Sequence, residues 1–142
     1  MSYAKLEDVR QREKKYGADL PEGLPAEMAL EFRQNFQKVF GFVPEDRYVA
    51  LLAIADGLDV NSFHIYSSGH SASRIESVFS ANKTWRNKGE PDDLVFLAES
   101  GQDLFVVRDG KNTLLDRYSG DEIQVFDSFE QMADYIIDRM LS

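Results

Sequence analysis

Four short segments in the C-terminal part of the chain constrain its fold most. They are rich in β-branched and aromatic residues, which favours strands: "LVFLAE" (94–99), "DLFVVR" (103–108), "TLLDRY" (113–118) and "EIQVF" (122–126). Only "SGQ", "DGKN" and "SGD" separate them. A crossover between parallel strands needs about a dozen residues or more, so connections this short predict consecutive antiparallel hairpins, which form a meander.

Helical patterns lie on both sides of these segments. Apolar residues at spacings of three and four predict a helix over 28–40, whose apolar stripe includes Val39, and a terminal helix over 129–141. Residues 4–16 predict a charged, peripheral helix, 48–55 a buried one, and 75–85 another, which Ser71 or Ser73 could cap. The "SFHIYS" segment alternates like a strand. We therefore predict an α+β fold: an antiparallel meander sheet with helices packed on one side and a C-terminal helix.

The "ADGLDVN" segment concentrates Asp56, Asp59 and Asn61 around Gly57 and suggests an ion-binding loop. A calcium loop of the EF-hand type needs oxygen ligands at alternate positions and a later Glu. Leu58 occupies one of those positions and no Glu follows in range. A glycine that ends the preceding helix explains the segment without a ligand, and Asp56 and Asp59 remain secondary candidates for surface contact.

Residues that could support catalysis are few. The chain has no cysteine and two histidines, His64 and His70, too few for a recognisable zinc site. His70 lies in "SSGHSAS", but no nucleophile-elbow motif accompanies its serines, and no glycine-rich phosphate loop occurs elsewhere. We predict no catalytic residues, no metal and no cofactor, and hence no enzymatic activity; a small-ligand or hydrolytic site near His70 is the remaining enzymatic hypothesis.

The charge of the chain is unevenly distributed. Twelve acidic residues balance twelve basic ones in the first 88 residues, whereas the last 54 contain thirteen acidic and four basic residues and carry the whole net charge of −9. Such a surface favours a basic protein partner and disfavours nucleic acid. The contact candidates are the acidic residues around the first predicted hairpin: Glu90, Asp92, Asp93, Glu99 and Asp103.

The order of these elements resembles the SUKH superfamily, which includes fungal cell-wall-synthesis regulators and bacterial immunity proteins. Three segments carry the resemblance: "VPEDRYVALLAIADGLDVNSFHIYS", "DLVFLAESGQDLFVVR" and "IQVFDSFEQMADYIIDRML". They match the family's helix–break–strand unit, its strand–turn–strand unit and its terminal strand and helix. The resemblance implies a SUKH-like α+β domain over 24–142, preceded by an N-terminal helical extension over 1–23.

The resemblance also implies a function. Bacterial members of the family are commonly immunity proteins that bind and neutralise a toxin, often a nuclease. We therefore expect a non-enzymatic protein whose acidic surface docks onto a basic toxin domain. The alternative is a housekeeping adaptor of the same fold without a toxin partner. The absence of cysteine, of a signal-peptide pattern and of a long apolar segment favours a cytoplasmic location and no membrane contact.

Overall fold

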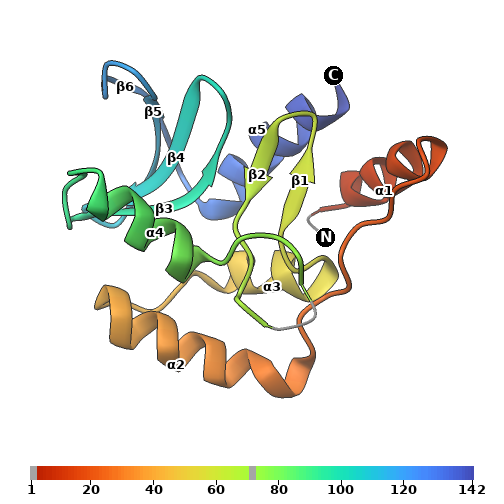
Figure 1. Cartoon of the computed structure of the whole chain (residues 1–142), viewed down its shortest axis with the longest axis horizontal. Coiled ribbons are helices and arrows are strands. Elements are labelled where there is room, and N and C mark those ends of the chain that lie inside the picture. The colour runs from red at the N-terminus through yellow and green to blue at the C-terminus, as the bar shows by residue number, and fades with distance from the viewer. Residues whose placement is uncertain (1–2, 71–72) are drawn as a thin grey trace.

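A computed structural model describes residues 3–70 and 73–142. Helices and strands follow one another from the N-terminus to the C-terminus as Figure 1 shows. The helices are α1 (Lys5–Lys15), a short 3-10 turn η1 (Ala26–Met28), α2 (Ala29–Phe40), α3 (Asp46–Ile54), α4 (Val78–Asn87) and α5 (Phe129–Leu141). The strands are β1 (Leu58–Val60), β2 (Phe63–Ile65), β3 (Leu94–Glu99), β4 (Asp103–Arg108), β5 (Lys111–Asp116) and β6 (Glu122–Phe126).

The six strands form one antiparallel sheet in the order β1-β2-β3-β4-β5-β6. Two of its turns are tight: Asn61 and Ser62 join β1 to β2, Asp109 and Gly110 join β4 to β5, and all four have positive φ. Two-residue hairpins of this handedness match the twist of the strands they connect. The α+β class, the meander and the C-terminal helix are confirmed.

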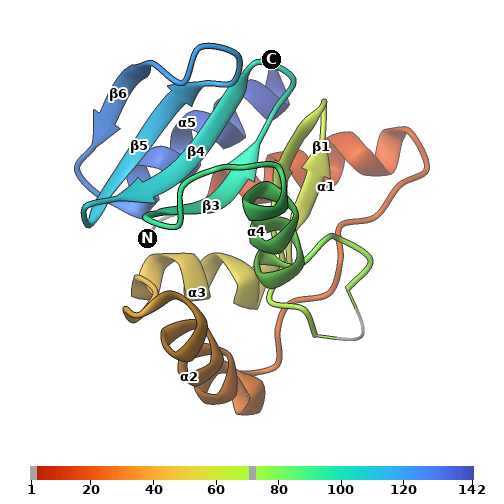
Figure 2. The same cartoon turned by 60° about the vertical axis from the view of Figure 1, so that its left-hand side comes forward.

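Helices contact both faces of the central strands. Phe96 of β3 pairs with Val106 of β4, and the ring of Phe96 stacks on Trp85 of α4 with 5.0 Å between ring centroids. Phe105, next to Val106, points to the opposite face and lies 6.0 Å from the ring of Tyr135 in α5. Helix α5 thus packs on one face of the sheet, and α4 covers the opposite face at β3 (Figure 2). Nearly all of β3 is therefore buried.

The residues before position 24 pack against the rest of the chain. In α1, Leu6 and Val9 are buried in the same core as the sheet, and Leu20 follows them there. Lys5 of α1 forms an ion pair with Asp138 of α5, at 2.6 Å. The boundary between an extension and a domain at residue 24 stays a prediction from the resemblance.

Two helical details differ from the sequence-based expectation. The helix expected from Ile75 begins at Val78 with Ser77 as its N-cap, whose side chain accepts a hydrogen bond from the Ser80 backbone N–H. Ser73 instead donates its hydroxyl to the Asp56 backbone oxygen at 2.5 Å, while Ser71 lies outside the described residues. Val39 is 53% exposed, because the residues of α2 that pack inward lie on another side of the helix.

The "ADGLDVN" segment contains a strand that its sequence did not predict. Helix α3 ends at Ile54, and Gly57 has a φ of +90°. A Cβ atom there would also lie 2.7 Å from the Ile75 side chain, so glycine is required both for its conformation and for the close approach. From Leu58 the chain continues as β1, which pairs with β2. A strand of three residues is too short to show a clear alternation.

None of the helices within the described residues is long and apolar enough to cross a lipid bilayer.

Candidate protein-binding surface

The five acidic residues predicted around the first hairpin do not form one patch. Glu90, Asp92 and Asp93 precede β3, whereas Glu99 is its last residue and Asp103 begins β4 beside that far end. A strand of this length spans about 20 Å. The prediction that these carboxylates cluster is therefore wrong, since closeness in sequence was taken for closeness in space.

Glu99 is largely occupied by partners within the chain. One of its oxygens accepts a hydrogen bond from the Tyr66 hydroxyl, and the other accepts one from Arg117 at 3.1 Å. Trp85 donates its indole N–H to the same Tyr66 oxygen at 3.1 Å. Burial, together with the bond to Glu99, raises the pKa of Tyr66 far above its ordinary value. Glu99 thus belongs to a network that joins α4, the residue after β2, the end of β3 and the segment after β5.

Asp103 is half-buried at the start of β4, and burial raises its pKa although a hydrogen bond with Ser100 opposes the shift. Asp92, by contrast, has a side chain that is 94% exposed, 3.7 Å from Arg86. Of the predicted contact residues, Asp92 and its exposed neighbour Asp93 remain the most accessible to a partner.

Asp56 and Asp59 have different positions. Asp56 is only 1% exposed, and its carboxylate accepts hydrogen bonds from the backbone N–H of Ser68 at 2.8 Å and from its hydroxyl at 2.7 Å. The prediction that Asp56 is a surface contact is wrong, because this carboxylate holds the loop after β2 in place. Asp59 is exposed on β1 opposite His64, with 3.2 Å between the two side chains.

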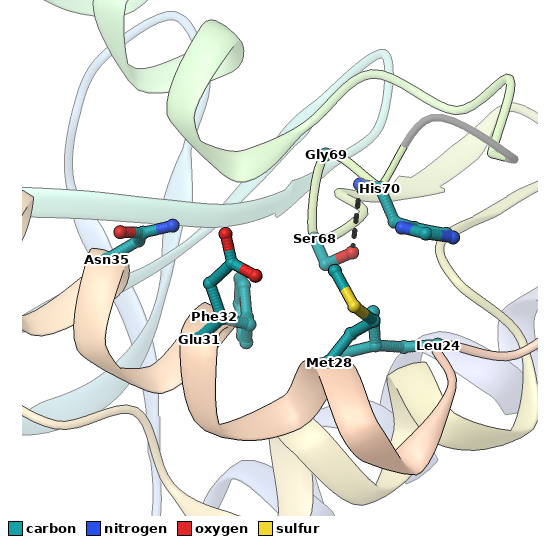
Figure 3. Close-up of a pocket in the computed structure, with 8 residues that line it drawn as sticks. All are labelled: Leu24, Met28, Glu31, Phe32, Asn35, Ser68, Gly69 and His70. Carbon is teal, nitrogen blue, oxygen red and sulfur yellow. Dashed lines mark hydrogen bonds between the residues drawn. The ribbon is translucent and has the colours of Figure 1, made fainter.

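The loop that carries His70 faces α2 across a pocket of about 200 Å³ (Figure 3). Ser68 is the serine nearest to His70 in this pocket, but its hydroxyl donates to Asp56. The dashed line in Figure 3 joins the Ser68 oxygen to the backbone N–H of His70, not to its imidazole. Within residues 3–70 and 73–142, no hydrogen bond links the ring to a serine hydroxyl. The geometry therefore gives no support to a Ser–His pair.

An acidic hollow lies between the start of α1 and the outer face of α5, and we call it the α5 groove. It measures about 620 Å³ and is lined by Tyr3, Ala4, Lys5, Arg47, Glu130, Asp134 and Asp138. Its three carboxylates are spaced four residues apart, which places them on one side of the helix. Lys5 pairs with Asp138, and Arg47 lies 3.7 Å from Glu130.

Asp134, in the middle of this row, is exposed and has no hydrogen bond or ion pair with any described residue. Burial of its carboxylate by neighbouring atoms, followed by the charges of Glu130 and Asp138, raises its pKa. The row was not predicted, although its spacing of four opposite the apolar stripe of the terminal helix was visible in the sequence. Across the described residues, no group of three or more His, Asp or Glu side chains is placed to hold a metal ion.

The turn between β5 and β6 presents an aromatic side chain. Tyr118 is 82% exposed, and its hydroxyl donates to the Gly101 carbonyl at 3.1 Å. Asp116 fixes the turn, since one of its oxygens accepts hydrogen bonds from the backbone N–H groups of Tyr118 and Ser119 at 2.9 and 2.8 Å. Exposed tyrosines are enriched where proteins contact one another, and this one is held in place before any partner arrives.

The same turn should respond to acid. The two backbone hydrogen bonds hold the pKa of Asp116 below its ordinary value of 3.8. The stabilisation of the turn is therefore present above pH 3.8 and is lost as the pH falls through the lower pKa of the folded state. An NMR titration should show the Asp116 carboxyl carbon and the Tyr118 and Ser119 amides changing together, with a midpoint below 3.8. Asp116→Asn should abolish that transition in the two amides, and a midpoint at or above 3.8 would contradict the assignment.

Comparison with known proteins adds evidence about the fold. No protein-family model matches the sequence, and no curated protein matches it. Among solved structures, the crystal structure of a protein from Pseudomonas syringae pv. tomato is similar, with a TM-score of 0.59 and 15% identity. The match covers 93% of this chain and 98% of that one. At this identity the similarity shows the fold alone, and it extends over nearly the whole of both chains.

Proposed function

We propose that this chain is a non-enzymatic binding protein of the SUKH type, an immunity protein that neutralises a basic toxin domain. The observation that carries the proposal is the α5 groove, where Asp134 lies between Glu130 and Asp138 without an ion pair to any residue that the structure describes. The order of the segments that resemble the SUKH superfamily supports it as well. A toxin that acts on nucleic acid has a basic cleft for phosphates, and an acidic protein can occupy such a cleft.

A cationic side chain docked in the α5 groove would stabilise the ionised carboxylates there. The raised pKa of Asp134 indicates that its ionised form is disfavoured, first by burial of the carboxylate and then by the negative charges of Glu130 and Asp138. A lysine or arginine of the partner placed there would offset the repulsion and form a charge-assisted hydrogen bond. Acidic residues elsewhere on the surface, such as Asp92, would contribute mainly to the attraction between the proteins at a distance.

The partner can be sought by co-purification with the products of neighbouring genes, and the groove by charge reversal. Asp134→Lys should weaken binding about tenfold or more, mainly by faster dissociation, since a loss of about 1.4 kcal/mol is a factor of ten. Asp92→Lys is the matched control, because it changes the net charge equally outside the groove. It should slow association at low salt and leave dissociation nearly unchanged. Both variants can be measured by surface plasmon resonance at two salt concentrations.

Each result decides between hypotheses. Equal effects of the two substitutions would show that only net charge matters, and an unchanged affinity and salt dependence for both would rule out acidic docking. Capture of a partner that is not a toxin would favour the adaptor. Thermal unfolding serves as a folding control, since Asp134→Lys removes a repulsion and should not destabilise the chain.

A further inference from the structure

A second hollow, the apolar pocket, lies where α2 and α3 meet the sheet. It measures about 190 Å³, and its apolar wall includes Phe36, Phe42, Val43, Tyr48, Leu97 and Phe129. The aromatic rings pack against one another, with 5.3 Å between the centroids of Phe36 and Phe42 and 5.0 Å between those of Tyr48 and Phe129. The wall is therefore already formed and needs little rearrangement to receive an occupant.

The volume of the apolar pocket suits a single ring. A protein cavity of about 150 Å³ holds benzene, whereas sites for whole ligands usually measure about 300–1,000 Å³. A pocket between these sizes fits the side chain of one aromatic residue. Aromatic side chains that fill such pockets commonly contribute most of the affinity of a protein interface.

The polar groups beside the apolar pocket are hydrogen-bond acceptors. Asn112 is 4% exposed and pairs in the sheet with Val107, which lines the pocket. Its side-chain N–H donates to the carboxylate of Glu45, which also lines the pocket, at 2.5 Å. This bond fixes the orientation of the amide, because its oxygen would be repelled by the carboxylate. The Asn112 amide oxygen is buried and has no hydrogen-bond partner among the described residues. A buried acceptor without a donor is unfavourable.

The lining supplies no free side-chain donor. The Tyr48 hydroxyl donates to the Tyr66 carbonyl at 2.9 Å, and the second Glu45 oxygen accepts the Phe129 N–H at 3.1 Å. Of these acceptors, Glu45 lines the pocket, whereas Asn112 lies behind the lining and its oxygen is closed to solvent. An occupant that carries an N–H or O–H group would complement this acceptor-rich, negatively charged end, and the Asn112 amide would have to shift toward the pocket to accept its hydrogen bond.

The apolar pocket also adjoins the α5 groove. Glu45 of the pocket and Arg47 of the groove lie at the start of α3, and Phe129 and Glu130 lie at the start of α5. We propose that the apolar pocket receives one tryptophan or tyrosine side chain of the protein partner, whose basic residues dock in the groove. This inference rests on the proposed function for the identity of the partner, but the pocket can be tested without it.

Side-chain analogues are the probes: 3-methylindole for tryptophan, p-cresol for tyrosine, and toluene as the ring without a donor. Titrated into the isotope-labelled full chain, the first two should shift the NMR signals of Gly110 and Leu97 in a saturable manner. Val43→Trp, at a rim position that is 53% exposed, should block the mouth and abolish these shifts. Shifts spread over the surface, or unaffected by Val43→Trp, would overturn the pocket.

Asn112→Leu tests whether the occupant donates a hydrogen bond to the Asn112 amide oxygen. The preference for p-cresol over toluene should fall about fivefold in this variant, and an unchanged preference would show that the amide oxygen plays no part. If Asn112→Leu does not fold, the comparison of 3-methylindole with 1,3-dimethylindole in the unchanged protein tests the same point. Equal affinities there would exclude the donor.

The complex with the protein partner then shows whether the ring in the apolar pocket belongs to that partner or to a free small molecule. The partner found by co-purification should displace p-cresol, and Val43→Trp should weaken its binding about tenfold. A probe that stays bound in the complex would mean that the pocket takes a free small molecule, and the assignment to the partner would be overturned. The two proposals can fail separately, because Asp134→Lys tests only the groove and probe binding tests only the pocket.

Discussion

Replacing Asn82 with alanine should lower the free energy of unfolding by about 4 kcal/mol, since each buried polar group that loses its partner costs about 1–3 kcal/mol. Asn82 is fully buried in α4. Its amide donates to the Phe96 carbonyl at 2.8 Å and accepts from the Phe96 N–H at 2.7 Å. One side chain thus satisfies both backbone groups of a buried residue in β3.

These two hydrogen bonds take the place of those that a longer β2 would form with β3. On one side β3 pairs with β4, and on the other it pairs with β2, which ends at Ile65 opposite Ala98. Phe96 lies beyond that end, so its backbone has no strand neighbour on the β2 side. Asn82 takes the place of that neighbour and connects α4 to the sheet. With alanine, Phe96 would keep its burial and lose both partners.

Urea unfolding followed by the fluorescence of Trp85, the single tryptophan, measures the effect. Asn87→Ala is the matched control, because Asn87 is exposed in the same helix, and we expect a change below about 0.5 kcal/mol. Asn82→Asp should cost at least as much as Asn82→Ala at neutral pH, since it keeps the acceptor but buries a carboxylate against the carbonyl oxygens of Val78 and Phe96. A cost for Asn82→Ala within about 1 kcal/mol of the control would refute the role of the amide.

Local patterns were sufficient to predict the meander and the terminal helix. The strands from Leu94 to Phe126 are separated by turns so short that only hairpins are feasible, and the stripe from Phe129 to Met140 has a regular helical period. What escaped prediction depends on residues far apart in the sequence. The β1–β2 turn is one example, because Asn61 is held there by hydrogen bonds to the backbone of Arg139 and Ser142.

The candidate site was likewise predicted only in part, because local patterns do not show which distant residues meet. Composition revealed that the C-terminal part is acidic, but not where its carboxylates meet. Asp56 looked accessible because its burial depends on Ser68, twelve residues away in a loop. Glu130 and Asp134 were overlooked because the groove needs Lys5 and Tyr3 from the other end of the chain to form its second wall. Partners of this kind leave no periodic signal in the sequence.

The segment before residue 24 also provides the second large prediction: Gly23→Ala should lower the free energy of unfolding by about 3 kcal/mol, the upper end of the usual cost of overpacking. A Cβ atom at Gly23 would lie 1.8 Å from the backbone oxygen of Ala53 in α3. The neighbouring bonds hold the segment at this distance: the Leu24 N–H donates to the Leu52 oxygen at 2.7 Å, and the Glu22 oxygen accepts from Asp56 at 3.1 Å.

An alanine at this position therefore has to push the whole segment away from the end of α3 and break both bonds. Gly101→Ala is the control, because nothing lies within 4 Å of its Cβ position and its φ is outside the left-handed region. Urea unfolding should separate the two variants, and hydrogen exchange should show faster exchange of the Leu24 and Asp56 amides only in Gly23→Ala. Equal stabilities would mean that the segment gives way easily and that residues 1–23 are a loosely attached extension. The expected loss would instead show that the segment around Gly23 packs tightly against the end of α3 as part of the folded core.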